Sequence, residues 1–253
     1  MVLIYQYIHL INIMKFKQIS YITAILLSLY TKNIFATFTE HQDGIINNII
    51  NTNKIIYLTF DACGGKSGSQ LDMKIINFLK KNKIKSTLFV TSKFILYNNN
   101  IDTIKELDNS GYFNIQNHGK NHKPASINGK TIYGIKGTRN IEELKEEILH
   151  CNNLIYKIIN KIPNWYRSGT AYYDTEAIQL INDLQLNIAG FAIAIDGGAT
   201  FKKDTIVKNM KNAKNGDILL IHINHPEKQD VRNGVIKGIK YLKKQGYNFE
   251  FLP

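Results

Sequence analysis

The sequence predicts an α/β fold built on a parallel sheet. Short runs rich in β-branched and aromatic residues alternate along the chain with longer amphipathic segments, and no stretch rich in Pro, Gly or Ser divides it. The 253 residues, of which 44% are hydrophobic, suit one sizeable domain with a large core. Strict alternation favours parallel strands, in a sheet that is either open or rolled into a barrel. The pattern by itself leaves both arrangements open.

Seven short apolar segments are predicted as strands. In order along the chain they are residues 55–60, 86–90, 112–116, 165–167, 187–195, 217–221 and 248–252. The first ends directly before Asp61, the fourth is brief, and the fifth carries almost no charge. Because helical segments separate nearly all of them, the strands are expected to pair in parallel.

Helices are predicted between these strands, at residues 70–83, 102–109, 140–160, 175–184, 205–213 and 233–245. Leu71, Ile75 and Phe78 place apolar side chains on one face of the first helix. Gly111 closes the second helix and Gly246 ends the last. The longest helix carries several glutamates near its start, where the helix dipole favours negative charge.

The N-terminal segment differs in composition from the rest of the chain. Lys15 and Lys17 give it a short basic start, residues 19–30 are mostly apolar, and small Ala36 stands where a signal peptidase would cleave. The apolar run is short for a membrane span. The residues before Met14 are interpreted as an upstream extension.

This pattern predicts three regions. Residues 1–36 are an N-terminal extension with a signal peptide, residues 37–53 a polar linker, and residues 54–253 the catalytic domain. The protein is therefore expected to be exported, to the periplasm or the cell exterior. A retained N-terminal anchor is the competing interpretation and leaves membrane association open.

The formal net charge of +12 could favour anionic polymers, membranes or nucleic acid. No block of like charge, zinc finger or aromatic RNA-binding motif accompanies it, so no nucleic-acid partner is predicted. Cys63 and Cys151 are the two cysteines. An exported protein could join them in a disulfide, and two free thiols fit the sequence equally well.

Polar residues with catalytic or metal-binding chemistry gather at the ends of five predicted strands. In a parallel barrel such positions share one rim. They are Asp61, His118, His122, Arg167, Asp196, His222 and His225.

The types of residue indicate a hydrolytic metal site. Two imidazoles four positions apart, His118 and His122, suit Zn²⁺ or a similar divalent ion. Such an ion lowers the pKa of bound water to about 7. A carboxylate can then accept a proton from the water, and a histidine can protonate the leaving group. Asp61 and His222 are the candidates for these two steps.

These residues resemble the motifs of the polysaccharide deacetylases. The similar segments are Thr59-Phe60-Asp61, His118-x-x-x-His122, Arg167 and Leu220-Ile221-His222, and the resemblance covers about residues 53–253. It implies a distorted (β/α)7 barrel that removes acetyl groups from N-acetylated amino sugars of a glycan such as peptidoglycan or a chitin-like polymer.

The resemblance also implies roles for single residues. His118 and His122 would bind a divalent metal ion, with Zn²⁺ expected. Asp61 would be the general base and His222 the general acid. The resemblance further implies that Arg167 orients Asp61 and that Asp196 tunes His222.

The chain departs from the family pattern at two places. Where the family has a second Asp as a metal ligand, this chain has Ala62. Cys63 could supply a thiolate instead, and Asp61, a water molecule, or a shift of Asp196 or His225 are the alternatives. After Arg167 the expected prolines are missing. Tyr172 is the candidate to bind substrate through its backbone N–H, and nearby glycines could offer other donors.

Two other enzyme classes fit poorly. Residues 64–67 (Gly-Gly-Lys-Ser) suggest a phosphate loop, but the pattern requires glycine where this chain has Phe60. Ser67, Ser126 and Ser168 could serve a serine hydrolase, yet none lies in a G-x-S-x-G turn.

A sugar-binding module that has kept the fold and lost catalysis with Ala62 is the main alternative function. Four aromatic residues could either stack on sugars or pack at the barrel edge. They are Tyr133, Trp165, Tyr172 and Tyr173.

Overall fold

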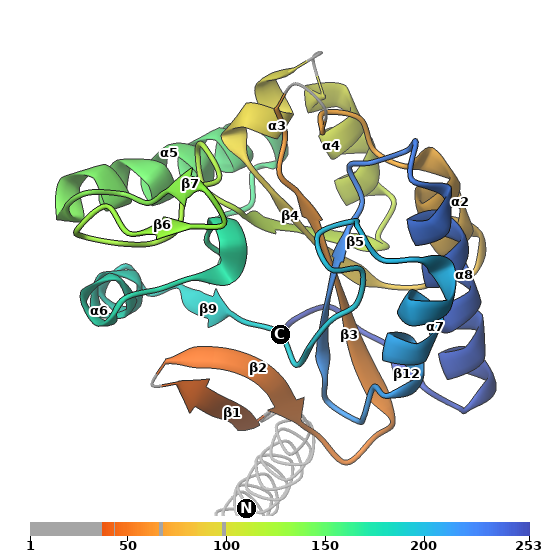
Figure 1. The fold of residues 1–253 in the computed structure, drawn as a ribbon. Helices are drawn as coiled ribbons and strands as arrows, with labels where there is room; N and C mark the ends of the chain where they lie inside the picture. Colours follow the sequence, from red (N-terminus) through yellow and green to blue (C-terminus); the bar gives the residue numbers. More distant parts are fainter. Residues whose placement is uncertain (1–36, 43, 66–67, 98–99) are drawn as a thin grey trace, which may run out of the picture. The chain divides into compact units, whose positions relative to one another are not determined.

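The computed structural model describes residues 37–42, 44–65, 68–97 and 100–253 (Figure 1). The predicted N-terminal extension and signal peptide, residues 1–36, lie outside the described residues. Within them, no helix has the length and apolar character needed to cross a membrane.

One curled sheet of ten strands forms the centre of the fold (Figure 1). Its order is β1-β2-β9-β8-β5-β4-β3-β11-β10, and β12 also pairs with β3. Each pairing between neighbours from β2 to β10 is parallel. The α/β class and the distorted (β/α)7 barrel are thus confirmed. The strands are β1 (Thr37–Gln42), β2 (Ile45–Ile50), β3 (Ile55–Ala62), β4 (Ser86–Val90), β5 (Phe113–Asn117), β8 (Trp165–Tyr166), β9 (Asn187–Ala189), β10 (Ile193–Ala194), β11 (Ile218–His222) and β12 (Asn248–Phe249).

The barrel is distorted where its two edges approach each other. Residues 187–195 were predicted as one strand, but the segment divides into β9, which pairs with β8, and β10, which pairs with β11. Between them the N–H of Gly190 donates to Ile46 O and that of Ala192 to Ile218 O, at 2.9 and 2.8 Å. A Cβ on Gly190 would lie 2.0 Å from Asn47 Oδ1, so any other residue at this crossing would have to displace the Asn47 side chain.

The segment predicted as a linker, residues 37–53, contains β1 and β2 instead. In β2 the isoleucines Ile45, Ile46 and Ile49 are buried, and the strand pairs with β9. Asn47 Oδ1 accepts a hydrogen bond from the N–H of Phe191 at 2.7 Å. The polar asparagines of this strand therefore serve the sheet rather than a flexible connection.

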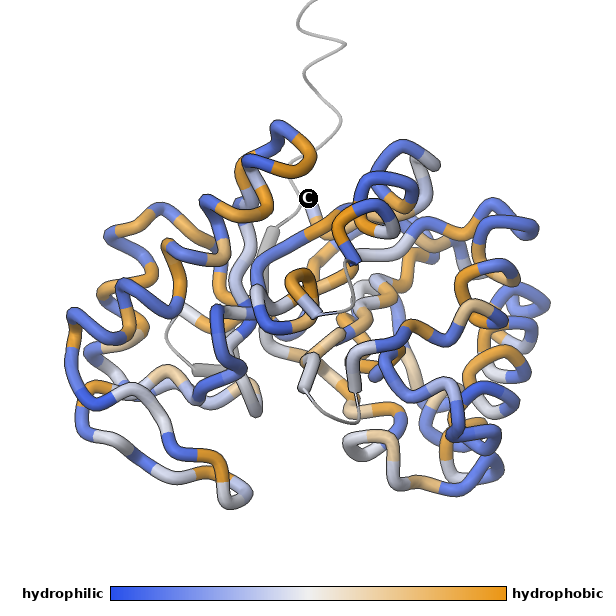
Figure 2. The backbone as a smooth tube through the Cα atoms, turned by 90° about the horizontal axis from the view of Figure 1, so that it is seen from above, coloured by the Kyte–Doolittle hydropathy of each residue, from blue (hydrophilic) through white to orange (hydrophobic). Residues whose placement is uncertain are grey.

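Helices surround the sheet, and side-chain caps begin four of them. The side chains of Asp72, Thr91, Asn140 and Asp174 accept backbone N–H groups at the starts of α2, α3, α5 and α6. Apolar residues gather along the central strands and recur along the helices, as an amphipathic helix on a buried sheet requires (Figure 2). The helices are α2 (Met73–Lys81), α3 (Ser92–Leu96), α4 (Ile101–Asn109), α5 (Ile141–Ile159), α6 (Thr175–Asp183), α7 (Lys203–Lys211) and α8 (Gln229–Lys244).

The long connection between β5 and α5 includes a small antiparallel hairpin. Its strands are β6 (Thr131–Ile132) and β7 (Ile135–Lys136), and they pair only with each other. The loop before the hairpin carries His118 and His122. It lies between α5 and the turn that follows β8.

Candidate active site and metal centre

The strand order brings polar side chains from distant parts of the sequence together at the carboxyl end of the sheet. Asp61 near the end of β3 is directly opposite His222, the last residue of β11. His118 follows β5 and Arg167 follows β8, and the N–H of Arg167 donates to Asn117 O at 3.0 Å. This is the shared rim that the sequence predicts for a parallel barrel.

Asp61 forms a buried ion pair with Arg167. The distance between Asp61 Oδ1 and Arg167 NH1 is 2.8 Å, and the two side chains are 4% and 0% exposed. Burial raises the pKa of Asp61, but the charges of Arg167 and His118 outweigh it and hold this pKa below its usual value. The carboxylate is therefore ionised at neutral pH.

Arg167 is fixed from several sides. Its NH2 group donates to Gly190 O at 2.8 Å, NH1 donates to Thr59 Oγ1 at 2.9 Å, and the guanidinium lies 4.4 Å from the ring centroid of Phe89. These contacts offset the buried charge of Arg167 and orient its guanidinium group toward Asp61.

His118, His122 and Cys63 present a set of metal-binding atoms. Their nitrogen and sulfur atoms all lie within 4.8 Å of one another. His118 Nδ1 is 2.8 Å from Arg167 O, which assigns this nitrogen as the N–H donor and leaves Nε2 without a proton of its own, 3.6 Å from Cys63 Sγ. Two imidazoles and a thiolate are ligands that Zn²⁺ accepts, so the residues present fit a zinc-like ion.

Several residues could replace the missing carboxylate as third ligand. Of these, the structure places Cys63 beside the two histidines. Asp61 is held by Arg167, Asp196 is held by His222, and His225 Nδ1 lies 3.3 Å from Glu227 Oε1. The metal-binding group within the described residues contains none of these three.

The Cys63 thiol is surrounded by imidazoles. Burial raises its pKa, but the charge of His122 and hydrogen bonds with His118, His122 and His222 outweigh this effect, and the pKa lies well below its usual value. Cys63 and Cys151 are both free, and Cys151 donates to Val90 O at 3.3 Å, so the structure contains no disulfide between them. Ala62, the residue that replaces the expected carboxylate, is fully buried in the core.

His222 is held by Asp196 through two contacts. Asp196 Oδ1 lies 3.0 Å from His222 Nδ1, and Asp196 Oδ2 accepts the backbone N–H of His222 at 2.6 Å. Burial lowers the pKa of His222, but hydrogen bonds with Asp196 and Cys63 outweigh it and hold this pKa well above its usual value. His222 is therefore protonated at neutral pH.

Glu147 positions the loop that carries His122, and sequence reasoning missed it. Its Oε1 accepts the backbone N–H groups of Asn121 and Lys123, at 2.7 and 3.1 Å. His122 itself has a φ of 62°, an unusual conformation for a residue other than glycine. A signal was present in the sequence, because Glu147 lies three residues after Leu144 on the face of α5 that becomes buried.

The turn after Arg167 closes against the same loop. A Cβ on Gly169 would lie 2.1 Å from His122 O, so only glycine permits this approach. Thr170 and Ala171 adopt positive φ values of 67° and 50° and line the pocket. Tyr172 follows them and is not among the lining residues.

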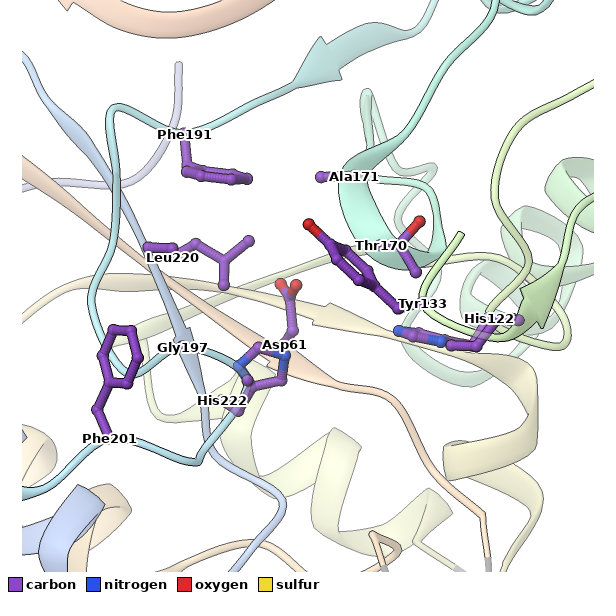
Figure 3. A pocket seen from close by; sticks show the side chains of 13 residues that line it. Asp61, His122, Tyr133, Thr170, Ala171, Phe191, Gly197, Phe201, Leu220 and His222 are labelled. Atoms are coloured by element: carbon purple, nitrogen blue, oxygen red, sulfur yellow. The ribbon is translucent and has the colours of Figure 1, made fainter. Parts of the chain in front are cut away.

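A pocket of about 580 Å³ opens above these groups, with Asp61, His122 and His222 among its lining residues (Figure 3). Its volume lies in the ~300–1,000 Å³ range of small-molecule sites. Most of the remaining lining is apolar, including Tyr133, Phe191, Phe201 and Leu220.

The aromatic residues singled out in the sequence differ in exposure. Trp165 and Tyr173 are buried, with Trp165 Nε1 donating to Pro253 O and the Tyr173 hydroxyl to Ala189 O, so they pack inside the fold. Tyr133 alone of the four lines the pocket. Ser126 and Ser168 form hydrogen bonds with Asn128 and Tyr172, and Lys66 and Ser67 lie outside the described residues.

Comparison with known proteins identifies related sequences. The family model for polysaccharide deacetylase matches residues 49–189. Two curated peptidoglycan deacetylases are similar in sequence. The peptidoglycan-N-acetylmuramic acid deacetylase PdaA of Bacillus subtilis is 27% identical over 202 residues, which cover 78% of this chain and 69% of that protein. A peptidoglycan-N-acetylglucosamine deacetylase of Bacillus cereus is 26% identical over 207 residues, which cover 79% and 86%.

The fold is also similar to solved structures. One is described as a wild-type carbohydrate esterase family 4 pseudoenzyme from Bacillus anthracis, with a TM-score of 0.66 and 20% identity. The match covers 83% of this chain and 68% of that chain. At this identity the likeness concerns the fold.

Proposed function

The chain belongs to the polysaccharide deacetylase family, and from this premise we propose that it is an exported, metal-dependent hydrolase of N-acetylated glycans. It would cleave the amide bond between an acetyl group and an amino sugar of peptidoglycan or a chitin-like polymer. The single observation that carries the proposal is the convergence of Cys63, His118 and His122 with the Asp61–Arg167 and His222–Asp196 pairs.

The proposed metal ligands are His118, His122 and Cys63. The hydrogen bond from His118 Nδ1 to Arg167 O fixes the ring so that Nε2 is available as a ligand atom. The low pKa of the Cys63 thiol keeps the sulfur as a thiolate, the form that binds metal. When bound, a divalent ion such as Zn²⁺ supplies Lewis-acid polarisation of the substrate carbonyl and makes water nucleophilic near neutral pH.

We assign one proton transfer to each of the two buried pairs, Asp61–Arg167 and His222–Asp196. Asp61, kept ionised by Arg167, accepts a proton from the attacking water. His222, kept protonated by Asp196, donates from Nε2 to the departing amine, because Nδ1 is occupied by the carboxylate. For the carbonyl oxygen of the substrate we propose a backbone N–H of the turn after Arg167. Tyr172, the candidate from the sequence, directly follows Thr170 and Ala171, which line the pocket.

Acetate release from a panel of N-acetylated glycans, measured together with the metal content of the purified protein, tests the proposal. The wild-type protein should hold about one ion per chain and lose turnover with a chelator. His118→Ala and His122→Ala should lose metal and activity together, whereas His222→Ala should keep the metal and lose turnover. Full activity in His118→Ala would contradict the assignment.

Cys63 requires its own test because we propose that its thiolate takes the place of the family's second carboxylate. Cys63→Ser should weaken zinc binding, measured by competition with a chromophoric chelator. An unchanged zinc affinity would exclude the thiolate as a ligand. Cys151→Ser is the matched control, because that thiol is buried, has a pKa raised to about 12, and is hydrogen-bonded away from the metal group.

The second candidate function is a sugar-binding module without catalysis. Two observations favour it: Ala62 offers no ligand atom, and one protein of similar fold is described as a pseudoenzyme. Such a module would hold an N-acetylglucosamine oligomer and release no acetate, whereas the enzyme would release acetate.

Export and the domain limits are part of the proposal. The basic start, the apolar run and Ala36 support a cleaved signal, and the curated relatives are named for peptidoglycan, a polymer outside the cell membrane. N-terminal sequencing of the protein recovered outside the cytoplasm should give a chain that begins at Thr37. Recovery of the intact N-terminus from the membrane fraction would indicate a retained anchor.

A further inference from the structure

Eight lysines gather at the end of the sheet that is opposite the pocket. The pocket lies at the carboxyl ends of β3 and β11, so the segments that lead into these parallel strands and into β4 and β12 lie at the other end. The lysines stand at the ends of α2, α7 and α8 or in the segments that enter a strand, and all but one are exposed. We call this surface the basic end, and its lysines are Lys54, Lys81, Lys83, Lys85, Lys211, Lys214, Lys243 and Lys244.

Contacts between these segments make the basic end one continuous surface. The helices α2, α7 and α8 lie next to one another along the sheet (Figure 1). Lys243 Nζ donates to Asn82 O at 3.4 Å, which joins the end of α8 to the end of α2. Lys211 Nζ lies 5.2 Å from the centroid of the Tyr241 ring, which joins the end of α7 to α8. Lys54 Nζ donates to a carbonyl oxygen directly after α8, at 3.0 Å.

Acidic side chains balance little of this charge. Glu250 pairs with Lys85 at 2.7 Å, whereas Asp217 is buried and accepts the backbone N–H of Lys214. Four of the ammonium groups have no ion pair or hydrogen bond with any part of the chain that the structure describes, and they belong to Lys81, Lys83, Lys214 and Lys244. The basic end therefore presents a net positive charge to its surroundings.

Helix dipoles explain only part of the cluster. A dipole stabilises cations in the last turn of a helix, which accounts for the lysines that end α2, α7 and α8. Lys83 and Lys214 lie beyond the helices. Lys83 has a φ of 54°, in a position after a helix where glycine is preferred, and Gly246 takes the corresponding position after α8 with a φ of 84°. A lysine is thus present where the backbone itself favours glycine.

Apolar side chains accompany the lysines. Ile50 at the end of β2 is 49% exposed, and the N–H of its neighbour Ile49 donates to Gly216 O at 2.9 Å, beside the segment that enters β11. The Tyr247 ring lies 5.6 Å from Lys54 Nζ and is partly exposed. Lysines interspersed with aromatic and aliphatic side chains are typical of protein surfaces that lie on a bilayer.

We propose that the basic end binds the surface of a bilayer that contains anionic phospholipids. All of its cations are lysines, although arginine is better suited to bind a single phosphate group in fixed geometry. Lysines spread over the ends of three helices suit a diffuse negative surface. Because the pocket lies at the opposite end, this attachment would direct the pocket away from the membrane. The inference goes beyond the proposed hydrolysis and does not depend on it.

Sedimentation with lipid vesicles tests the proposal. The exported protein is mixed with phosphatidylcholine vesicles, with or without about 30% phosphatidylglycerol, and the ratio of the two partition coefficients is measured. Each lysine near an anionic surface strengthens binding about fivefold. Replacing Lys81, Lys83, Lys214 and Lys244 together by Gln should therefore lower this ratio about 100-fold or more. The wild-type ratio should also fall as salt is raised from about 50 to about 500 mM.

A matched variant loses the same charge elsewhere on the surface. Lys105, Lys130, Lys145 and Lys157 are exposed and lie outside the basic end. Replacing these four by Gln should keep the wild-type ratio within about threefold, and both variants should keep the wild-type Tm. Since all the proteins share one N-terminus, any binding through that segment is common to them. An equal loss in the two variants would show that net charge alone attracts the protein, and would overturn the proposal.

A soluble anionic polymer provides the competing partner. Poly(glycerol phosphate) at the same phosphate concentration as the vesicles should displace little of the bound protein. If it displaces most of the protein, and its binding depends on the same four lysines, the basic end recognises a polyanion in solution and the membrane proposal fails. A wild-type ratio near one would overturn it as well. Neither result bears on acetate release, so the proposed function is tested separately.

Discussion

Removing the Arg167 guanidinium should strongly destabilise the protein. In Arg167→Met the carboxylate of Asp61 would stay buried, at 4% exposure, and only the two histidines, His118 with Nε2 at 3.6 Å and His222 on the neighbouring strand, would still offset its charge. The hydrogen bonds to Thr59 Oγ1 and Gly190 O would be lost at the same time. Breaking a buried ion pair from one side costs about 3–5 kcal/mol, because an uncompensated charge remains in the interior.

Urea denaturation and thermal melting measure this cost. For a domain of this size each kcal/mol lowers Tm by about 2–4 °C, so Tm should fall by about 6–20 °C. Arg139→Met is the control, because Arg139 is 78% exposed in its ion pair with Glu143 and such surface pairs contribute about 0–1 kcal/mol. In Arg167→Met/Asp61→Asn the buried charge is gone, and part of the lost stability should return.

The stability that the Asp61–Arg167 ion pair contributes should decrease as the pH falls. Burial raises the pKa of Asp61, but the charges of Arg167 and His118 outweigh it, so the folded pKa lies below the unfolded one. The ion pair therefore stabilises the fold above the unfolded pKa, and this stabilisation disappears as pH falls through the folded pKa. The gap between wild type and Arg167→Met should narrow in acid. A loss below about 1 kcal/mol at neutral pH, with no coupling to Asp61→Asn, would refute the reasoning.

Three further changes test other parts of the site. Asp196→Asn removes the carboxylate that raises the pKa of His222, so the alkaline limb of the kcat/KM profile should move to lower pH. An alkaline limb that does not move would show that another group titrates. Glu147→Met should leave the fold intact and weaken zinc affinity about 10–100-fold in a chelator competition, because the loop of His122 loses its anchor. Gly169→Ala should destabilise the protein by about 1–3 kcal/mol in urea, because its Cβ would overlap His122 O, and unchanged stability would show that the turn can move away.

A neighbouring glutamate provides the control for Glu147→Met. Glu146 is exposed on the same helix and pairs with Lys120 at the surface. Glu146→Met should leave zinc affinity unchanged. If both substitutions weaken zinc binding equally, the effect would reflect charge near the site rather than the hydrogen bonds of Glu147.

The sequence predicted the strands of the sheet well because their burial leaves a local pattern. Residues 86–90 and 217–221 correspond to β4 and β11 almost residue for residue, since short apolar runs rich in β-branched residues mark buried parallel strands. It failed at β2 because asparagines interrupt its buried isoleucines. It also failed at residues 187–195, where a continuous apolar run hides a change of pairing partner. That change depends on tertiary contacts with β2, which no local pattern encodes.

Residue type and strand position together predicted where the polar residues converge. Asp61, His118 and His222 each stand at the end of a strand, and a parallel sheet places such ends together. The supporting contacts were harder to foresee. Glu147 acts through backbone N–H groups of a loop, and Tyr133 has a φ of 50° in the turn of a hairpin that the sequence did not predict. Both depend on backbone conformation rather than on residue identity.

In the crossing between β9 and β10, two adjacent residues have different roles. Gly190 O holds the guanidinium of Arg167, and the next side chain, Phe191, faces the cavity. A ligand in contact with the Phe191 ring would thus lie one residue away from the carbonyl that accepts a hydrogen bond from Arg167. A ligand that displaced the Phe191 ring would therefore act next to the support of Arg167, on a span that Asn47 Oδ1 fixes by accepting the N–H of Phe191 at 2.7 Å.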